Sequence, residues 1–111
     1  MLLEKEVLGH PIRADIAQLD QGLHVLLTGG CCTHVGAVTL AGPGEQTRTL
    51  LRQAHKDDVV SRRWAEELCR ATGAPACVAC GIHYDNATKE QLTVIVQTCE
   101  ELLKEASEAL R

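Results

Sequence analysis

The chain has 111 residues, the usual size of one domain, and we expect residues 1–111 to form a single domain. Its net charge of −4, its scattered basic residues and its near lack of aromatic side chains argue against a nucleic-acid-binding surface. Hydrophobic residues make up 45% of the chain but aromatic ones only 2%, so the core must be aliphatic, and we expect a homodimer that buries further apolar surface.

Neither a membrane span nor a secretion signal is expected. No apolar run has the length of a transmembrane helix, and the first six residues lack the basic and then apolar order of a signal peptide. We therefore predict a cytoplasmic protein whose six cysteines stay reduced. Most of them, including Cys69 and Cys99, are expected to act as small hydrophobic core residues.

The first half of the chain has the pattern of β-strands. Apolar residues alternate with polar ones from Ile12 to Ile16, and further apolar or alternating segments follow. We expect four strands, within residues 12–16, 23–27, 35–41 and 47–53. Turn-forming residues at 20–22, 29–30 and 42–44 separate them, so an antiparallel arrangement is the simplest interpretation.

The second half changes to helical periodicity. Asp57 or Asp58 can cap a helix in which apolar residues recur every three or four positions, and Gly73 followed by Pro75 ends it. The next apolar run, residues 76–82, is short and continuous. It is typical of a central strand that is covered on both faces.

A long amphipathic helix closes the chain. Thr88 and Gln91 form a capping box at its start. Its apolar stripe consists of Leu92, Ile95, Val96, Cys99, Leu102, Leu103, Ala106 and Leu110. Because a helix of this length is about as wide as the whole domain, its far end is expected to reach a second copy of the chain.

Together these elements predict an α+β domain. Their order is four strands, a helix, a fifth strand and a second helix, with both helices on one face of a mostly antiparallel sheet. A crossover through the first helix makes the fourth and fifth strands parallel, so their carboxyl ends share one edge of the sheet. His55 and His83 follow those ends. The Gly29-Gly30 pair lies at the same edge as these histidines if the second strand runs in the same direction.

This edge has features of an anion site. Gly29, Gly30 and Gly36 allow close approach of the backbone to a ligand or a nest of amides, and His34 lies between them. Helix N-termini at the same edge favour a phosphate. The pattern is neither a dinucleotide fingerprint nor a P-loop, and a plain hairpin turn at Gly29-Gly30 is the simpler alternative.

The histidines at this edge have structural alternatives as well. A lone histidine is more often structural than functional, but several at strand ends favour a binding site. Asp57 and Asp85 can orient His55 and His83 through their ring N–H groups. Helix capping is nevertheless the favoured role for Asp57 and for Asn86.

Two sharper chemical interpretations stay open. Zinc-ligand types are present at Cys31, Cys32, His34, Cys80 and His83. Their spacing does not favour a zinc site, because Cys77 and Cys80 face opposite sides of a strand, and we expect no metal. A nucleophilic Cys31 or Cys32 beside His34 is the second possibility, and turn-filling cysteines are favoured over it.

Three motifs, in this order and spacing, resemble the small accessory component of bacterial gallate decarboxylase and the related prenylated-flavin chaperone-like domains. The first motif comprises Gly29, Gly30, His34, Val35 and Gly36. The second is His55-Lys56-Asp57-Asp58, and the third comprises Gly81, Ile82, His83, Asp85, Asn86 and Ala87. The resemblance covers roughly residues 20–105, and Cys31-Cys32-Thr33 departs from the acidic, proline-containing turn of the family.

The resemblance implies a non-catalytic accessory protein with a fold similar to that of proteasome assembly chaperones. Such a protein binds or delivers FMN or prenylated FMN for the large subunit of a prenylated-FMN-dependent decarboxylase, and it is often a dimer. The expected cofactor-binding residues are Gly29, Gly30, His34, Gly36, His55, Lys56, Gly81, His83, Asp85 and Asn86. Lys56 suits the phosphate, whereas Tyr84 is the only aromatic residue near the motifs.

Two other functions remain as alternatives. One is a small metal-dependent or histidine-dependent enzyme that uses the same histidines. The other is a protein-interaction module in which the long helix is functional, with Leu102 and Leu103 as its contact residues.

Overall fold

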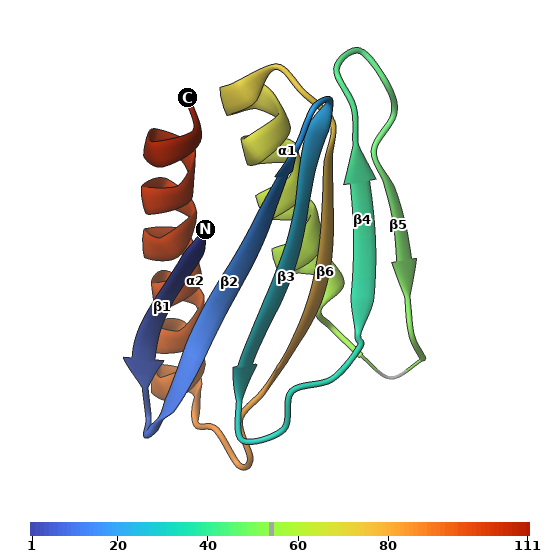
Figure 1. Ribbon diagram of the computed structural model, residues 1–111. Helices are drawn as coiled ribbons and strands as arrows, with labels where there is room; N and C mark the ends of the chain where they lie inside the picture. The colour runs from blue at the N-terminus through green and yellow to red at the C-terminus, as the bar shows by residue number, and fades with distance from the viewer. Residues whose placement is uncertain (54) are drawn as a thin grey trace.

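The computed structural model describes residues 1–53 and 55–111. One sheet carries both helices on the same face, with α2 lying across the β1–β2 side and α1 across β6 and β4 (Figure 1). The strands are β1 (Leu2–Val7), β2 (His10–Leu19), β3 (Gly22–Gly30), β4 (Ala37–Ala41), β5 (Arg48–Leu51) and β6 (Ala76–His83). The helices are α1 (Asp58–Thr72) and α2 (Lys89–Leu110). Neither is both long and apolar enough to cross a membrane.

The predicted α+β class is confirmed, and the sheet is mixed. Its strand order is β1-β2-β3-β6-β4-β5. Strands β3 and β6 pair in parallel, and the other neighbours in the sheet pair antiparallel. The sheet is therefore mostly antiparallel with the parallel pair β3–β6 at its centre. The crossover through α1 makes β5 and β6 run the same way, with β4 between them.

The element order has one strand more than predicted, because β1 precedes the four expected strands. Residues 2–7 alternate between more and less buried positions, as a strand does. Three of them are charged, so their hydrophobicity does not show this alternation. Lys5 lies on the helix-facing side, where its amine is 3.1 Å from the carboxylate of Glu105 on α2. Its aliphatic stem covers apolar surface while its charge is paired.

The core lies between the sheet and the two helices. Ile12, Val25 and Val78 project from the sheet and are fully buried, and Trp64 from α1 is 1% exposed. Predicted helix ends are confirmed: Gly73 has a left-handed φ of 70° after α1, and Thr88 with Gln91 forms the capping box of α2.

The far half of α2 is part of this core. Leu102 and Leu103 are 0% and 1% exposed, so the alternative in which these two residues contact a partner does not hold. The helix packs along α1, β1 and β2, which bury this end of the apolar stripe within the chain itself.

Four strands, β1, β3, β5 and β6, end at the edge where both helices begin. Strand β4 is antiparallel to both β5 and β6, and β3 is parallel to β6, so β3, β5 and β6 point the same way. The expected meeting of carboxyl ends is confirmed, and the second predicted strand, β3, does run in this direction. Figure 1 shows this edge below the two helices.

The segment from β3 to β4 must cross the end of β6, because β6 lies between these strands in the sheet. Residues 31–36 make this crossing, and the amide of Gly36 donates to the carbonyl of Cys80 at 3.0 Å. The backbone of His34 lies so close to Gly81 that a side chain at residue 81 would collide with the carbonyl of His34. Gly81 is therefore a crossing point of two backbones.

We expect Gly81→Ala to lower the free energy of unfolding by about 3 kcal/mol, because neither backbone can yield without breaking sheet hydrogen bonds. Gly44→Ala is the matched control, since Gly44 has a φ of 72° and open space around it. That change should cost about 1 kcal/mol from backbone strain alone. Urea denaturation of the two variants measures the difference, and equal losses would contradict the crossing.

Candidate functional site

A cleft of about 610 Å³ opens at the shared edge, between the first turns of α1 and α2. Its polar side is formed by Cys32, His34, His55, Lys56, Asp57 and His83. The structure thus brings together four residues that the sequence predicted for a common site, His34, His55, Lys56 and His83. They come from three segments that are far apart in the chain.

A buried carboxylate holds the polar side in place. Asp57 is 8% exposed, and its Oδ1 accepts a hydrogen bond from the amide of Ile82 at 3.0 Å. Its Oδ2 lies 3.0 Å from Nε2 of His34. The other ring nitrogen of His34, Nδ1, donates to the carbonyl of Cys32 at 3.0 Å. One side chain thereby joins the start of α1, the end of β6 and the crossing segment.

This arrangement corrects two predictions about Asp57. The residue occupies the N-cap position of α1, but its carboxylate makes no capping hydrogen bond. Its φ of −71° and ψ of −10° are helical, whereas a capping residue is usually extended. The carboxylate also orients His34 rather than His55, because the crossing segment places the ring of His34 beside it.

His55 stands next to His34 on the polar side. The two ring centroids are 5.0 Å apart, with the planes tilted by 48°. Nδ1 of His55 donates to the carbonyl of Gln53 at 2.8 Å. A neutral His55 ring therefore carries its proton on Nδ1 and leaves the lone pair of Nε2 for a ligand.

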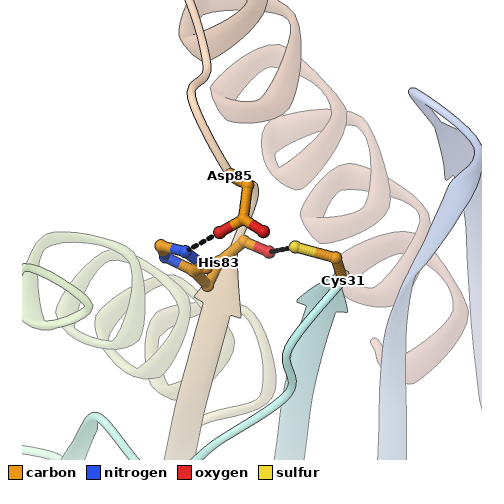
Figure 2. Close-up of side chains that lie close together, drawn as sticks. All are labelled: Cys31, His83 and Asp85. Atoms are coloured by element: carbon orange, nitrogen blue, oxygen red, sulfur yellow. Dashed lines mark hydrogen bonds and ion pairs between the residues drawn. The ribbon is translucent and has the colours of Figure 1, made fainter.

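His83 ends β6 and is oriented by Asp85, as predicted. Its Nε2 lies 2.8 Å from Oδ1 of Asp85. Figure 2 shows the Cys31 side chain on the side of Asp85 away from the His83 ring. Hydrogen bonds from His83 and then from the Cys31 thiol lower the pKa of Asp85. The aspartate is therefore a carboxylate at neutral pH, ready to accept these bonds.

The opposite side of the cleft is apolar, and no motif in the sequence indicated it. Val60 comes from α1 and Ile82 from β6, while α2 contributes Leu92, Ile95 and Val96. Leu92 and Val96 are 51% and 54% exposed, so they form a wall open to solvent. The predicted stripe of α2 contained both residues, but its periodicity alone does not distinguish core from cleft. The stripe is unusually wide, and this width was the signal that some of its residues lie outside the core.

The predicted glycines are not among the described residues that line the cleft. Gly29 and Gly30 are the last residues of β3 and pair with Ile82 and His83 of β6, so they form no turn. A side chain at Gly30 would collide with the carbonyl of His83, and one at Gly36 with the carboxylate of Asp57. Close packing of backbone segments explains these glycines without a ligand.

Asn86 does not cap α2, contrary to the favoured prediction. It has a left-handed φ of 54° in the turn before the helix, and Thr88 is the capping residue. An asparagine tolerates this conformation better than most residues. Its role is therefore to reverse the chain between His83 and α2.

The buried cysteines are not positioned as ligands or nucleophiles. Cys80 faces the core while Cys77 lies on the other face of β6, as the odd spacing predicted. Burial raises the pKa of the Cys80 thiol far above its ordinary value, and it raises that of Cys99 to about 12. Both are neutral thiols at physiological pH. The zinc set considered from the sequence, which included Cys80, is therefore not assembled.

We expect Asp57→Ala to lower the free energy of unfolding by about 3 kcal/mol, because it leaves the amide of Ile82 and the ring of His34 without their acceptor. Asp58→Ala removes a neighbouring charge from the first turn of α1 and should cost only about 0.5 kcal/mol. Urea denaturation measures both values. Similar losses in the two variants would show that Asp57 acts only through the helix terminus.

Known proteins resemble this chain in sequence and in fold. Protein LpdD of Lactiplantibacillus plantarum is 25% identical over 105 residues, covering 90% of this chain and 77% of that protein. A chain from a chaperone complex for yeast 20S proteasome assembly has a similar fold, with a TM-score of 0.51, 15% identity and 95% coverage of each chain. The sequence model of the prenylated flavin chaperone LpdD-like domain matches residues 6–111, and the chain therefore belongs to this family.

Proposed function

We propose that this chain is a non-catalytic accessory protein that binds prenylated FMN, or FMN, in the cleft and delivers it to the large subunit of a decarboxylase. The carrying observation is that one cleft combines an apolar wall with a cationic and hydrogen-bonding rim. A flavin nucleotide has the same two-sided character, with an apolar ring system at one end and a phosphate at the other. Family membership supports the same ligand class.

The size and lining of the cleft fit this ligand. Its volume of about 610 Å³ lies within the range of small-molecule sites. Leu92 and Val96 supply the apolar surface that a ring system needs, and Tyr84 is the aromatic residue beside them. The sequence has few aromatic residues to contact a flavin ring. Aliphatic side chains from two helices supply this apolar contact surface instead.

The phosphate is expected at Lys56 and His55. These residues stand on the polar side, where the Lys56 amine and a protonated His55 imidazole can donate hydrogen bonds to an anion. The N-terminus of α2 is a weaker candidate, because Thr88 and Gln91 satisfy each other's backbone amides there. The carboxylate of Asp57 likewise disfavours an anion at the first turn of α1.

An accessory role needs release as well as binding. The chemistry of the cofactor would take place in the decarboxylase, so this chain has only to hold the flavin and hand it over. The half-exposed wall leaves part of a bound ring open to solvent, which favours modest affinity and transfer. The free thiols of all six cysteines suit a reducing compartment, and we place the protein in the cytoplasm.

Titration by calorimetry with FMN and with prenylated FMN tests this function. His55→Ala and His83→Ala should each weaken binding by about tenfold or more, which corresponds to about 1.4 kcal/mol. His24→Ala is the matched control, since His24 is an exposed histidine of β3 outside the cleft lining. Absence of saturable binding of either flavin, or an equal loss in the control, would contradict the proposal.

We also propose that the protein is a homodimer formed by the sheet face that the helices leave open. Cross-strand pairs place Leu26, Ala79, Val38 and Leu50 in one row across this face. Leu40 lies beside the row and is 51% exposed, and Leu50 is 79% exposed. Such a row is costly to leave in water.

The charges around the row favour a second copy as its occupant. On the β2 side Asp15 pairs with Leu26, and on the β5 side Arg48 pairs with Leu40. A twofold axis parallel to the strands places the β2 side of one copy, with Asp15, opposite the β5 side of the other, with Arg48. The surface is therefore complementary to itself.

Light scattering after size exclusion should give twice the 12.0 kDa mass of one chain. Leu40→Lys should convert the protein to a monomer, because it puts a charge inside the apolar interface. Leu8→Lys is the control, since Leu8 is an exposed leucine in the turn between β1 and β2. A monomeric parent protein, or a dimer unchanged by Leu40→Lys, would contradict this interface.

A further inference from the structure

A second group of reactive side chains lies at the same edge, next to the cleft. The Cys31 Sγ, a His83 ring nitrogen and an Asp85 carboxylate oxygen all lie within 4.8 Å of one another. Figure 2 shows them at the ends of β3 and β6, with the carboxylate of Asp85 between the ring of His83 and the thiol of Cys31. Cys31 and Asp85 lie outside the cleft lining and border a smaller recess with Tyr84.

The backbone fixes the relative positions of these residues. Gly30 is paired with His83 in the parallel ladder, and the amide of Cys31 donates to the carbonyl of His83 at 3.0 Å. The Cys31 thiol contacts that same carbonyl at 3.5 Å. Asp85 follows two residues after His83 and already contacts its ring. The cluster therefore stands on hydrogen-bonded strand ends rather than on independent loops.

The chemistry of the three donors selects a metal class. A thiolate, an imidazole and a carboxylate are the ligands of Zn²⁺, which takes three protein ligands and keeps one open position in reactive sites. Hard ions such as Mg²⁺ and Ca²⁺ prefer oxygen donors and do not favour a thiolate. We propose that Cys31, His83 and Asp85 bind one Zn²⁺ ion with a fourth position open to solvent.

The geometry requires only small movements. Zinc bonds of about 2.0–2.3 Å place tetrahedral ligand atoms roughly 3.3–3.8 Å apart. A pair of ligand atoms at the limit of 4.8 Å must close by up to about 1.5 Å, which side-chain rotation of exposed residues supplies. The ion takes the place of the proton between His83 and Asp85, and the Cys31 thiol loses its proton on binding. Zinc affinity therefore rises with pH.

This site shares Cys31 and His83 with the zinc set considered from the sequence, but Asp85 takes the place of the other three members. Cys80 is buried in the core, and Asp85 was not in that set. His83 belongs to both the cleft and the cluster, so a bound ion also fixes one side of the cleft. The zinc proposal does not rest on flavin binding, because its test uses the metal alone.

The test is a titration of reduced, chelator-treated protein with Zn²⁺ against a chromophoric chelator, repeated with Co²⁺ to detect a thiolate charge-transfer band. We expect one equivalent of metal per chain and a band with Co²⁺. Cys31→Ser and Asp85→Asn should each weaken binding by at least about tenfold, as loss of even a supporting group does. Cys32→Ser is the matched control, because Cys32 is the adjacent exposed thiol outside the cluster.

Melting curves of the variants check that each is folded, which is expected for exposed side chains. Retained binding in Cys32→Ser together with loss in Cys31→Ser supports the site. The proposal is overturned if the parent protein shows no saturable binding. It is also overturned if Cys31→Ser binds like the parent protein, or if Cys32→Ser loses as much affinity as Cys31→Ser.

Discussion

The site depends on one buried carboxylate. Asp57 accepts the amide of Ile82 with one oxygen and contacts the His34 ring with the other, each at 3.0 Å. These bonds join the start of α1 to the end of β6 and to the segment that crosses over it. Because a buried carboxylate is costly unless its oxygens are satisfied, the three segments are held in one arrangement. The histidines then take positions that their own short segments do not determine.

The cleft follows from this arrangement of strand ends and helix starts. The parallel pair β3–β6 brings His83 to the edge, and the crossing segment brings His34 over the end of β6. The helices begin at the same edge, so the exposed Leu92 and Val96 face these histidines across the cleft. An aliphatic wall opposite a polar rim suits a ligand with an apolar ring and an anionic tail.

Periodicity and turn chemistry predicted much of this fold but less of the site. Both helices, the capping box at Thr88 and the shared edge followed from local patterns, whose physical causes are local too. Strand β1 was missed because its inward-facing Lys5 is paired with distant Glu105. Asp57 was predicted to cap α1 because its partner His34 is distant in the sequence, and local patterns do not reveal contacts between distant residues. For the same reason, Leu92 and Val96 were not separated from the core stripe of α2.

The most direct test of the account is a ¹H–¹⁵N NMR titration of the labelled protein with FMN. Shift changes should be concentrated at amides around the cleft, in particular those of Ile82, His83 and Val96. The chemical shifts of amides at the centre of the open sheet face, such as that of Leu26, should stay unchanged while only a small fraction of the protein has bound FMN. Changes centred on the open face, or none at saturating FMN, would contradict the central claim that this edge of the sheet is the flavin-binding site.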